Sequence, residues 1–219
     1  MIGLFGGTFD PIHFGHLRTA LEVLQALNME QVRFIPLHGA VHRAQPEVSP
    51  ALRLQMVEAA IADQPGFVAD DRELKRAGPS YTVDTLTDLR REQPDPVLCL
   101  MMGLDAFNGF TAWHRPEEIL RLAHLMVMQR PGETLLTSGA RELLETRRCQ
   151  GVAELKARRA GGVMLQTFTQ LQISATQIRG MLSQGRSPRY LLPDGVLQLI
   201  TEHNLYTRKG GYTRVVSPI

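Results

Sequence analysis

The sequence predicts an α/β domain with a Rossmann-like parallel sheet, helices on both faces and a helical C-terminal part. Short apolar runs recur at residues 2–5, 31–37, 97–102, 124–129 and 163–168, and each is too short for a long helix. Amphipathic helical patterns lie between these runs, and this alternation is typical of a parallel sheet. In such folds ligands bind at the carboxyl ends of the strands, so we expect the functional site there.

The helical patterns can be placed in order along the chain. After the first strand, one helical face carries Leu17, Leu21, Leu24 and Leu27, and the opposite face carries Arg18, Glu22 and Gln25. Ser49 before Pro50, and Ser80 before an apolar pattern, indicate helix starts. Residues 140–159 predict one or two exposed helices with a small basic excess. Gly185 and Asn204 are expected to end the last two helical stretches.

Length and composition favour one ordinary globular domain, residues 1–219. The chain has 219 residues, 43% of them hydrophobic and 21% charged, and repeats and low-complexity segments are absent. A net charge of +2 is too small to argue for a nucleic-acid partner. We therefore expect any anion site to be local, and the sequence leaves open whether copies of the chain form a homo-oligomer.

The cysteines and the N-terminus bear on the compartment. Two cysteines, Cys99 and Cys149, cannot build a framework of several disulfides, and Cys99 lies in an apolar run where a buried thiol is expected. The N-terminus reaches polar residues too early for a signal peptide, and no segment approaches the roughly 18 apolar residues of a membrane span. We expect a protein of the reducing cytoplasm with no membrane partner.

The strongest motif is GGTFDPIHFGH at residues 6–16, between the first strand and the first helix. Gly6 and Gly7 let the main chain approach a phosphate, and N–H groups at the start of a helix favour an anion. His13 and His16 are one helical turn apart, so both imidazoles can face the same ligand. The segment predicts a phosphate-binding loop.

Two other interpretations of this motif remain. One histidine could cap the helix while the other lies on the surface. A zinc site would need one or two further ligands besides the histidines, and Asp10 is the only obvious candidate nearby. The joint occurrence of glycines and histidines at these spacings favours phosphate binding over both.

A second motif, ISATQIR at residues 173–179, follows the strand at 163–168 and opens a helix. Ser174 is a good N-cap, Thr176 falls in the first turn, and Arg179 is about one turn further on. Their hydroxyl, N–H and guanidinium groups can converge on one polyphosphate. Taken alone, the segment is equally well read as an ordinary capped helix.

A third segment, GLDAFNGFTAW at residues 103–113, follows the strand at 97–102. Gly103 permits close approach of a ligand, and Asp105 can accept hydrogen bonds from ribose hydroxyls. Trp113, the single tryptophan, would pack in the core on composition alone. Residues 80–86, SYTVDTL, form a capped amphipathic helix pattern and indicate nothing further by themselves.

Over nearly the whole chain the sequence resembles the bacterial nicotinate-nucleotide adenylyltransferase family of the nucleotidyltransferase superfamily. GGTFDPIHFGHL and ISATQIR carry the resemblance, and SYTVDTL and GLDAFNGFTAW extend it. The resemblance implies transfer of AMP from ATP to nicotinate mononucleotide, giving deamido-NAD and pyrophosphate in NAD biosynthesis. Another superfamily adenylyltransferase, such as the pantetheine-phosphate enzyme, and a non-catalytic nucleotide-binding regulator are the alternatives.

The resemblance also implies the roles of particular residues. His16, His13 and Arg179 would be catalytic. ATP would be bound by these three together with Gly7, Thr8, Phe9, Gly103, Asp105, Ser174 and Thr176. The acceptor nucleotide would be bound by Arg43, Tyr81, Thr82, Leu104 and Trp113.

The chain departs from the family pattern at two places. Ala175 stands where the family commonly has a second serine, and the loop HGAVHR at residues 38–43 lacks a pair of prolines but keeps His42 and Arg43.

The acceptor phosphate is already anionic, so neither a catalytic base nor an enzyme nucleophile is expected. Mg²⁺ would be held chiefly by ATP oxygens and water, with no protein metal site.

Overall fold

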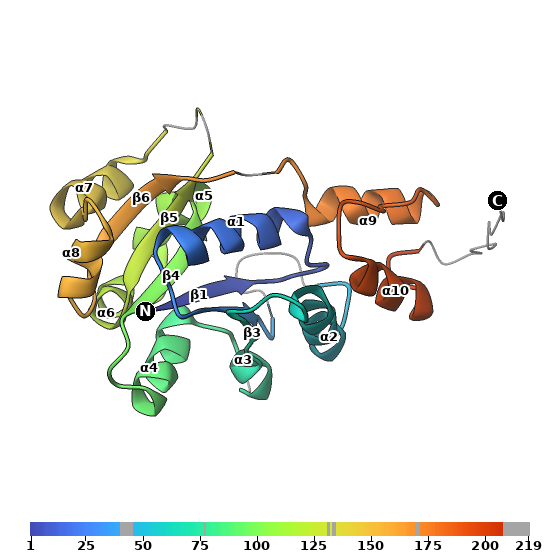
Figure 1. Cartoon of the computed structure of the whole chain (residues 1–219), viewed down its shortest axis with the longest axis horizontal. Coiled ribbons are helices and arrows are strands. Elements are labelled where there is room, and N and C mark those ends of the chain that lie inside the picture. Colours follow the sequence, from blue (N-terminus) through green and yellow to red (C-terminus); the bar gives the residue numbers. More distant parts are fainter. Residues whose placement is uncertain (40–45, 77, 131, 133–134, 170, 208–219) are drawn as a thin grey trace.

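A parallel β-sheet runs through the centre of the protein in the computed structural model, which describes residues 1–39, 46–76, 78–130, 132, 135–169 and 171–207 (Figure 1). Within these residues the sheet has six strands in the order β3-β2-β1-β4-β5-β6, and every neighbouring pair is parallel. The strands are β1 (Ile2–Gly7), β2 (Gln31–Pro36), β3 (Phe67–Ala69), β4 (Leu98–Gly103), β5 (His124–Gln129) and β6 (Val163–Thr167). The predicted Rossmann-like fold class is confirmed.

The five strands expected from the sequence are confirmed to within two residues at each end. The expectation missed β3, the edge strand beside β2. With three residues, β3 is too short to give an apolar run of its own, and Val68 at its centre is exposed.

The helices connect successive strands and extend beyond the sheet (Figure 1). They are α1 (Phe14–Ala26), α2 (Pro50–Ile61), α3 (Arg72–Lys75), α4 (Thr82–Glu92), α5 (Leu104–Asn108), α6 (Pro116–Leu122), α7 (Ser138–Arg147), α8 (Val152–Ala157), α9 (Ala175–Ser183) and α10 (Asp194–Glu202), with a short 3-10 helix at Phe110–Ala112. None of the described helices is long and apolar enough to cross a membrane.

Two apolar cores form because successive strand residues point to opposite faces of the sheet. In β4, Cys99 and Met101 join the core that includes α1, α2, α9 and α10. Leu98, Leu100 and Met102 join the core that includes α4, α5, α6 and α7. Both faces of the sheet are therefore covered, as the alternating sequence pattern predicts.

Helix starts were predicted correctly at two of three serines. The Ser49 hydroxyl accepts from the Leu52 N–H, and the Ser174 hydroxyl accepts from the Gln177 N–H at 3.1 Å. The expected start at Ser80 is wrong, because α4 begins at Thr82. The Ser80 hydroxyl instead accepts a hydrogen bond from the backbone N–H of His38 at 3.1 Å, so its side chain is engaged by another loop.

The buried face of α1 also differs from the expected leucine stripe. Thr19, Ala20 and Val23 are its buried residues, and Leu27 just beyond the helix is buried as well, whereas Leu17, Leu21 and Leu24 are half-buried. The residues that α1 buries are therefore smaller than the expected leucines, which remain only partly covered.

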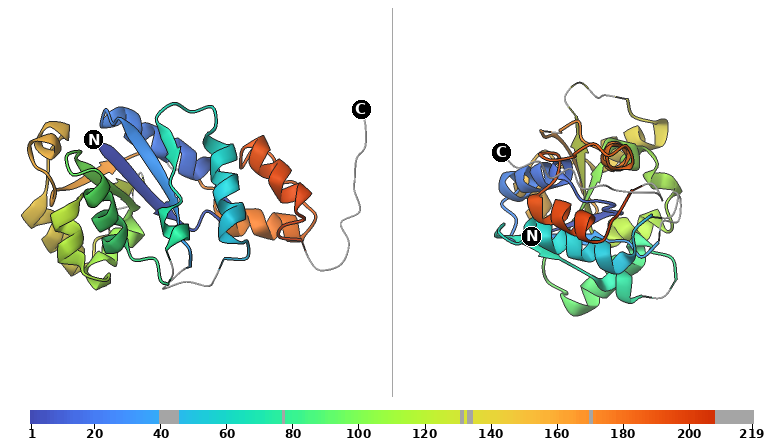
Figure 2. Two further views of the ribbon diagram at one scale, coloured as in Figure 1. Left: turned by 90° about the horizontal axis from the view of Figure 1, so that it is seen from below. Right: turned by 90° about the vertical axis from the view of Figure 1, so that its right-hand side faces the viewer.

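The C-terminal helices lie at the opposite end of the molecule from α7 and α8 (Figure 1). Helix α10 packs on α2, and Figure 2 shows these two helices and α9 side by side. Gly185, with φ of 71°, follows α9, and Asn204, with φ of 50°, follows α10, so both expected ends are confirmed. The left-handed backbone at each position stops the helix.

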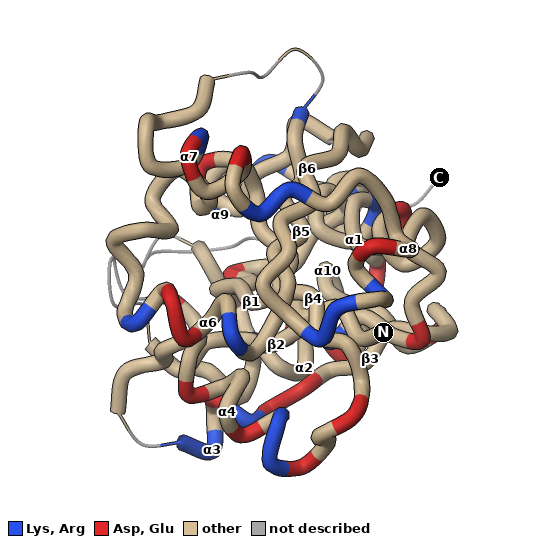
Figure 3. The backbone as a smooth tube through the Cα atoms, turned by 90° about the vertical axis from the view of Figure 1, so that its left-hand side faces the viewer, with Lys and Arg blue, Asp and Glu red and all other residues tan. Residues whose placement is uncertain are grey.

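Residues 140–159 form α7 and α8, in line with the expected one or two helices. Figure 3 shows acidic and basic positions interspersed over this end of the molecule. Arg147 also pairs with Glu117 at 3.3 Å. The basic residues of this region are therefore interspersed with acidic ones.

Candidate active site

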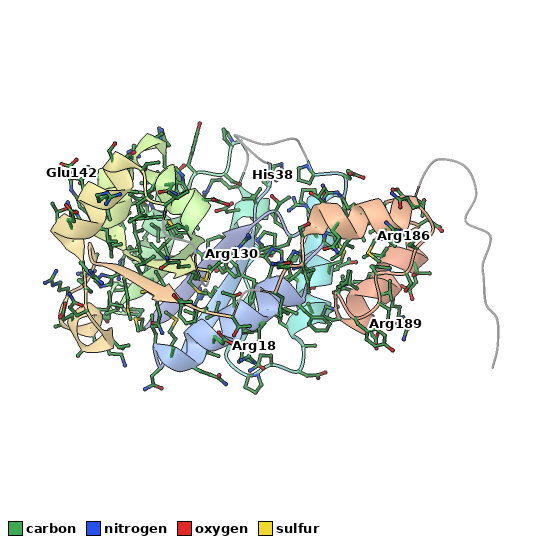
Figure 4. All side chains as sticks on the ribbon, turned by 90° about the horizontal axis from the view of Figure 1, so that it is seen from above. Arg18, His38, Arg130, Glu142, Arg186 and Arg189 are labelled. Carbon is green, nitrogen blue, oxygen red and sulfur yellow. The ribbon has the colours of Figure 1, made fainter. Side chains whose placement is uncertain are left out.

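A cleft of about 650 Å³ opens at the carboxyl ends of β1 and β4. These two strands are neighbours in the sheet, and the chain leaves them toward opposite edges, so the strand order reverses between them. Such a reversal point is where open α/β sheets bind ligands. In the side-chain view, Arg130 of the cleft lies in the middle of the molecule, between Glu142 at one end and Arg186 and Arg189 at the other (Figure 4).

Glycines shape the floor of this cleft. A Cβ added at Gly6 or Gly103 would meet no heavy atom within 4 Å, so at both positions the missing side chain leaves open space. A Cβ at Gly7 would stand 2.9 Å from the Phe9 ring. The absence of side chains thus lets a ligand approach the backbone at Gly6 and Gly103, whereas Gly7 leaves room for a ring of the protein itself.

Residues 6–13, which comprise the last two residues of β1 and the segment leading to α1, are called the Gly-Gly loop below. It turns at Phe9, whose φ of 48° is unusual for a bulky residue. The Phe9 ring is buried and meets the His16 ring edge-on, with 5.2 Å between ring centroids. The strained turn therefore places an aromatic wall beside His16.

His13 and His16 stack on each other, with ring centroids 3.8 Å apart and an angle of 23° between the planes. His13 immediately precedes α1 and its backbone N–H donates to Nδ1 of His16 at 3.3 Å. Because Nδ1 of His16 accepts, the proton of the neutral ring is on Nε2, which is then a donor. Nδ1 of His13 is buried and has no hydrogen-bond partner among the described residues.

Both imidazoles are held neutral. Burial lowers the pKa of His13 from 6.5 to about 4. Burial also lowers the pKa of His16 well below 6.5, and the neighbouring His13 lowers it further because two stacked rings cannot both carry a positive charge easily. Near neutral pH the pair therefore offers a neutral N–H donor rather than a fixed cation.

Gly15 permits the close packing of the two helix starts. A Cβ there would stand 2.9 Å from Nδ1 of His13 and 3.4 Å from the carbonyl oxygen of Ile173, just before α9. The hydroxyl of Thr19 donates to the carbonyl of Thr169 at 3.2 Å, and Glu22 accepts from the Thr169 N–H at 2.7 Å. These contacts fix the starts of α1 and α9 beside the same cleft, where N–H groups and helix dipoles favour an anion.

Arg179 reaches the cleft from α9. Its Nη1 donates to the carbonyl oxygen of Asp10 at 2.8 Å, and its Nε pairs with Glu47 at 3.1 Å. The Glu47 side chain is 61% exposed. Arg179 therefore links the Gly-Gly loop to α9, and one of its contacts is to a carboxylate that can turn into solvent.

Arg53 of α2 supports the Gly-Gly loop through hydrogen bonds, and sequence reasoning missed this residue. Its side chain is fully buried, and it donates to the carbonyl oxygens of Thr8 at 2.7 Å, Leu37 at 2.6 Å and Val48 at 3.2 Å. Burial lowers the pKa of Arg53, although a guanidinium keeps its charge in proteins. The sequence did contain a signal for it, because Arg53 is a single arginine on the apolar face of α2.

Nine of the predicted ATP-binding residues line the cleft together: Gly7, Thr8, Phe9, His13, His16, Gly103, Ser174, Thr176 and Arg179. Asp105 does not line it but is exposed in the first turn of α5, just beyond Gly103. Leu104 is buried in the core beneath α5. Arg43 lies outside the described residues.

The predicted acceptor residues form a separate aromatic group. The Tyr81 ring, just before α4, lies against His114 with 4.3 Å between centroids. Trp113, the neighbour of His114, packs half-buried against Phe110 at 5.5 Å, and Thr82 opens α4. The segments at 80–82 and 113–114 are thus brought together, and His114 is an additional residue that sequence reasoning missed.

Among the described residues, the cysteines and acidic side chains form no metal-binding group. No group of three or more His, Cys, Asp and Glu side chains there could hold a metal ion. Cys99 and Cys149 are both buried and free, and burial raises the pKa of Cys99 to about 12, which confirms the expected buried thiol. Because the thiolate is the reactive form, the thiol of Cys99 is inert.

Comparisons with known proteins agree with this geometry. Residues 4–181 match the family model described as "Cytidylyltransferase-like". A protein of Methylococcus capsulatus named "Probable nicotinate-nucleotide adenylyltransferase" is 47% identical over 95% of this chain and 100% of its own length. A protein of Aeromonas hydrophila with the same name is 48% identical over 94% and 96%.

A solved structure shares the fold. It is titled "Plasmodium falciparum nicotinic acid mononucleotide adenylyltransferase complexed with NaAD", with a TM-score of 0.72, 15% identity, and coverage of 94% of this chain and 96% of that one. At this identity the likeness establishes the fold.

Proposed function

Because the chain belongs to the nicotinate-nucleotide adenylyltransferase family, we propose that its cleft binds ATP and nicotinate mononucleotide and that its own residues divide the catalytic work as follows. The reaction joins nicotinate mononucleotide to the AMP part of ATP and gives deamido-NAD and pyrophosphate, a step of NAD biosynthesis. The arrangement of the cleft supports a direct transfer between the two substrates.

The observation that carries the proposal is the stacked pair of neutral histidines at the start of α1. The Nε2–H of His16 donates to an oxygen of the α phosphate. A neutral donor gains strength as negative charge accumulates on that oxygen in the transition state. His13, whose buried Nδ1 has no partner among the described residues, and the N–H groups of Thr8 and Phe9 hold the phosphate chain.

The acceptor phosphate supplies the attacking oxygen. It is anionic near neutral pH and attacks the α phosphorus in line, while the bond to the β-phosphate oxygen breaks. No proton has to be removed and no enzyme nucleophile takes part. The contribution of the protein is to align the two phosphates and to stabilise the developing charge.

The leaving pyrophosphate is held by the start of α9. Ser174 and Thr176 lie in its first turn, and Arg179 provides the permanent positive charge. When the triphosphate enters, a phosphate oxygen replaces Glu47 at the guanidinium, and the exposed carboxylate of Glu47 moves into solvent.

The adenosine part is assigned to the end of β4 in the cleft, and the pyridine part to the separate aromatic group. Gly103 leaves space at the end of β4, and Asp105 accepts from ribose hydroxyls. Because the side chain of Leu104 is buried in the core, only its backbone is available to the acceptor. Tyr81, Thr82 and Trp113 surround the pyridine ring. Arg43, which lies outside the described residues, is assigned to the acceptor phosphate.

The acid acceptor is preferred over the corresponding amide. Residues 80–86 contain no Lys or Arg, so discrimination comes from donors such as Thr82 and backbone N–H groups. Donors satisfy both oxygens of a carboxylate, whereas the NH₂ of an amide would meet another donor and leave both unpaired.

Mg²⁺ enters as part of the substrate, the complex with ATP. The donor set of the cleft fits this arrangement, since its histidines and Arg179 are suited to phosphate oxygens and hard cations prefer oxygen ligands. When bound, the ion neutralises part of the triphosphate charge.

Pyrophosphate release from ATP tests the assignment. The acceptors are nicotinate mononucleotide, nicotinamide mononucleotide and phosphopantetheine, and a preparation of His16→Ala checks that the activity belongs to this cleft. We expect kcat/KM for the acid to exceed that for the amide by about a hundredfold or more. Equal values would overturn the donor arrangement, and release only with phosphopantetheine would overturn the proposed acceptor.

A further inference from the structure

Asp10 connects the Gly-Gly loop to the C-terminal end of the described chain. Its carboxylate is buried, and its Oδ1 accepts from the hydroxyl of Tyr206 at 2.6 Å. Its Oδ2 accepts from the backbone N–H of Glu47 at 2.9 Å. One side chain of the loop is therefore bonded to two segments that are distant from it in sequence.

The backbone next to this contact is in a left-handed conformation at two residues. After α10 the chain passes through Asn204 with φ of 50° and Tyr206 with φ of 61°. Asparagine tolerates this region, but it is costly for a bulky aromatic residue. The cost is offset by burial of the Tyr206 ring in the core and by the short hydrogen bond to Asp10.

We propose that Tyr206 is a positioning residue, which holds Asp10 and thereby keeps the Gly-Gly loop in the conformation that binds the phosphates of ATP. The proposal rests on the proposed function for the identity of the anion. Tyr206 lies beyond residues 4–181, the part matched by the family model. It acts through Asp10 and does not line the cleft itself.

The effect reaches the phosphate site by two short routes. Asp10 directly follows Thr8 and Phe9, whose N–H groups are assigned to the phosphates. The carbonyl oxygen of Asp10 also accepts from Arg179 at 2.8 Å. A shift of Asp10 would therefore disturb both the loop and the guanidinium that binds pyrophosphate.

The protonation of Tyr206 agrees with this role. Burial, with the hydrogen bond to Asp10 and the charge of that residue, raises the pKa of Tyr206 above its ordinary value. The phenol therefore stays protonated over the working range and remains a donor.

The test replaces Tyr206 by Phe, which removes the hydroxyl and keeps the ring. The matched control is Tyr190→Phe, an exposed tyrosine in the same C-terminal segment with a left-handed backbone of its own. Binding of a non-hydrolysable ATP analogue is measured by calorimetry at a temperature where every variant is folded. Amide hydrogen exchange is followed for residues 6–13 and for β5.

For Tyr206→Phe we expect the dissociation constant of the analogue to rise by about fivefold to tenfold, with faster exchange in residues 6–13 and unchanged exchange in β5. The KM for nicotinate mononucleotide should change by less than about twofold, because its pyridine site is separate. Tyr190→Phe should match the wild type. A lower melting temperature with unchanged analogue binding would overturn the proposal, since it would indicate a structural role only.

A double-mutant cycle gives a second measurement. Asp10→Asn, Tyr206→Phe and the double variant are compared for analogue binding, and the effects should not add, because both single changes break one connection. Additive effects of the two substitutions on analogue binding would contradict the proposed role of Tyr206. Binding and exchange need no turnover, so failure of the proposed acceptor would leave these results interpretable.

Discussion

His16 meets four groups that together define its chemistry: the stacked His13 ring, the backbone N–H of His13, and the edges of Phe5 and Phe9. The aromatic rings exclude water and keep the imidazole neutral. The backbone N–H fixes the tautomer. A single residue is thus prepared as a donor before any substrate arrives, which is the form of preorganisation that lowers a barrier.

Replacing His16 by Ala tests this preparation. The variant should lose two to three decades in kcat, on the order of 100-fold to 1000-fold, because the donor acts mainly on charge that develops in the transition state. The Kd for ATP should rise much less. His203→Ala, an exposed histidine after α10, serves as control. Full activity of His16→Ala in steady-state kinetics would remove His16 from the mechanism.

The buried His13 makes stability depend on pH. The pKa of His13 is lowered to about 4, so between about 6.5 and 4 the unfolded chain binds a proton that the folded chain does not. Stability therefore falls as the pH falls through this window. His13 contributes at most roughly 3 kcal/mol to the loss.

Denaturant unfolding of the wild type and His13→Asn at pH 7.5, 6, 5 and 4 measures this contribution. The difference between the two proteins reports His13 together with its effect on the pKa of His16, while the contribution of His124, whose pKa is also lowered, is common to both proteins. The wild-type curve should fall more steeply toward pH 4. Parallel curves would contradict the assigned burial effect.

At the residue scale, site residues that lie together in one short segment could be predicted from the sequence, whereas residues that act through tertiary contacts were missed. The histidines, the glycines and ISATQIR each occupy one short segment next to a helix start, where local rules apply. Arg53 and Tyr206 act across 45 and 196 positions to reach Thr8 and Asp10. A single sequence can mark Arg53 as unusual on an apolar helix face, but it does not say which distant residue either side chain contacts.

At the scale of elements, the cleft lies at the reversal point of the sheet, where Gly6 near the end of β1 and Gly103 at the end of β4 leave open space. The strands and most helices could be predicted because hydrophobic periodicity is strong in buried elements. The start of α4 could not, since the Ser80 hydroxyl bonds His38 from another loop, and the three-residue β3 depends on pairing with β2.

Gly103→Ala tests the role of open space at the end of β4. An added methyl group meets no protein atom within 4 Å, and the ordinary backbone there accepts alanine, so the melting temperature should change little. ATP binding should weaken by at least about tenfold if the ligand occupies this space. Gly151→Ala, also in open space but outside the cleft, is the control. Unchanged ATP affinity in Gly103→Ala would place the nucleotide elsewhere.

At the scale of the whole molecule, the fold separates two tasks. The sheet reversal with the starts of α1 and α9 gathers the predicted phosphate groups, while the 80–82 and 113–114 segments form the aromatic group on the other core. The segment between α9 and α10 also contacts the start of α1, because the Phe14 N–H donates to the carbonyl oxygen of Leu191 at 3.0 Å.

This separation predicts independent effects of substitutions. Trp113→Ala should raise KM for the acid and the amide acceptors alike, because a stacking surface does not distinguish them, and should leave the Kd for ATP within about twofold. Steady-state kinetics with both acceptors and calorimetry with an ATP analogue provide the measurements. A large loss of ATP affinity in Trp113→Ala would show that the two sites are coupled.

Direct attack of the acceptor phosphate on ATP leaves a stereochemical record at the α phosphorus, which can be measured. The substrate is ATP made chiral at the α phosphorus with sulfur and an oxygen isotope, and the product is the corresponding deamido-NAD. A single in-line displacement predicts inversion of configuration. Retention would indicate two displacements through an enzyme nucleophile and would contradict the account.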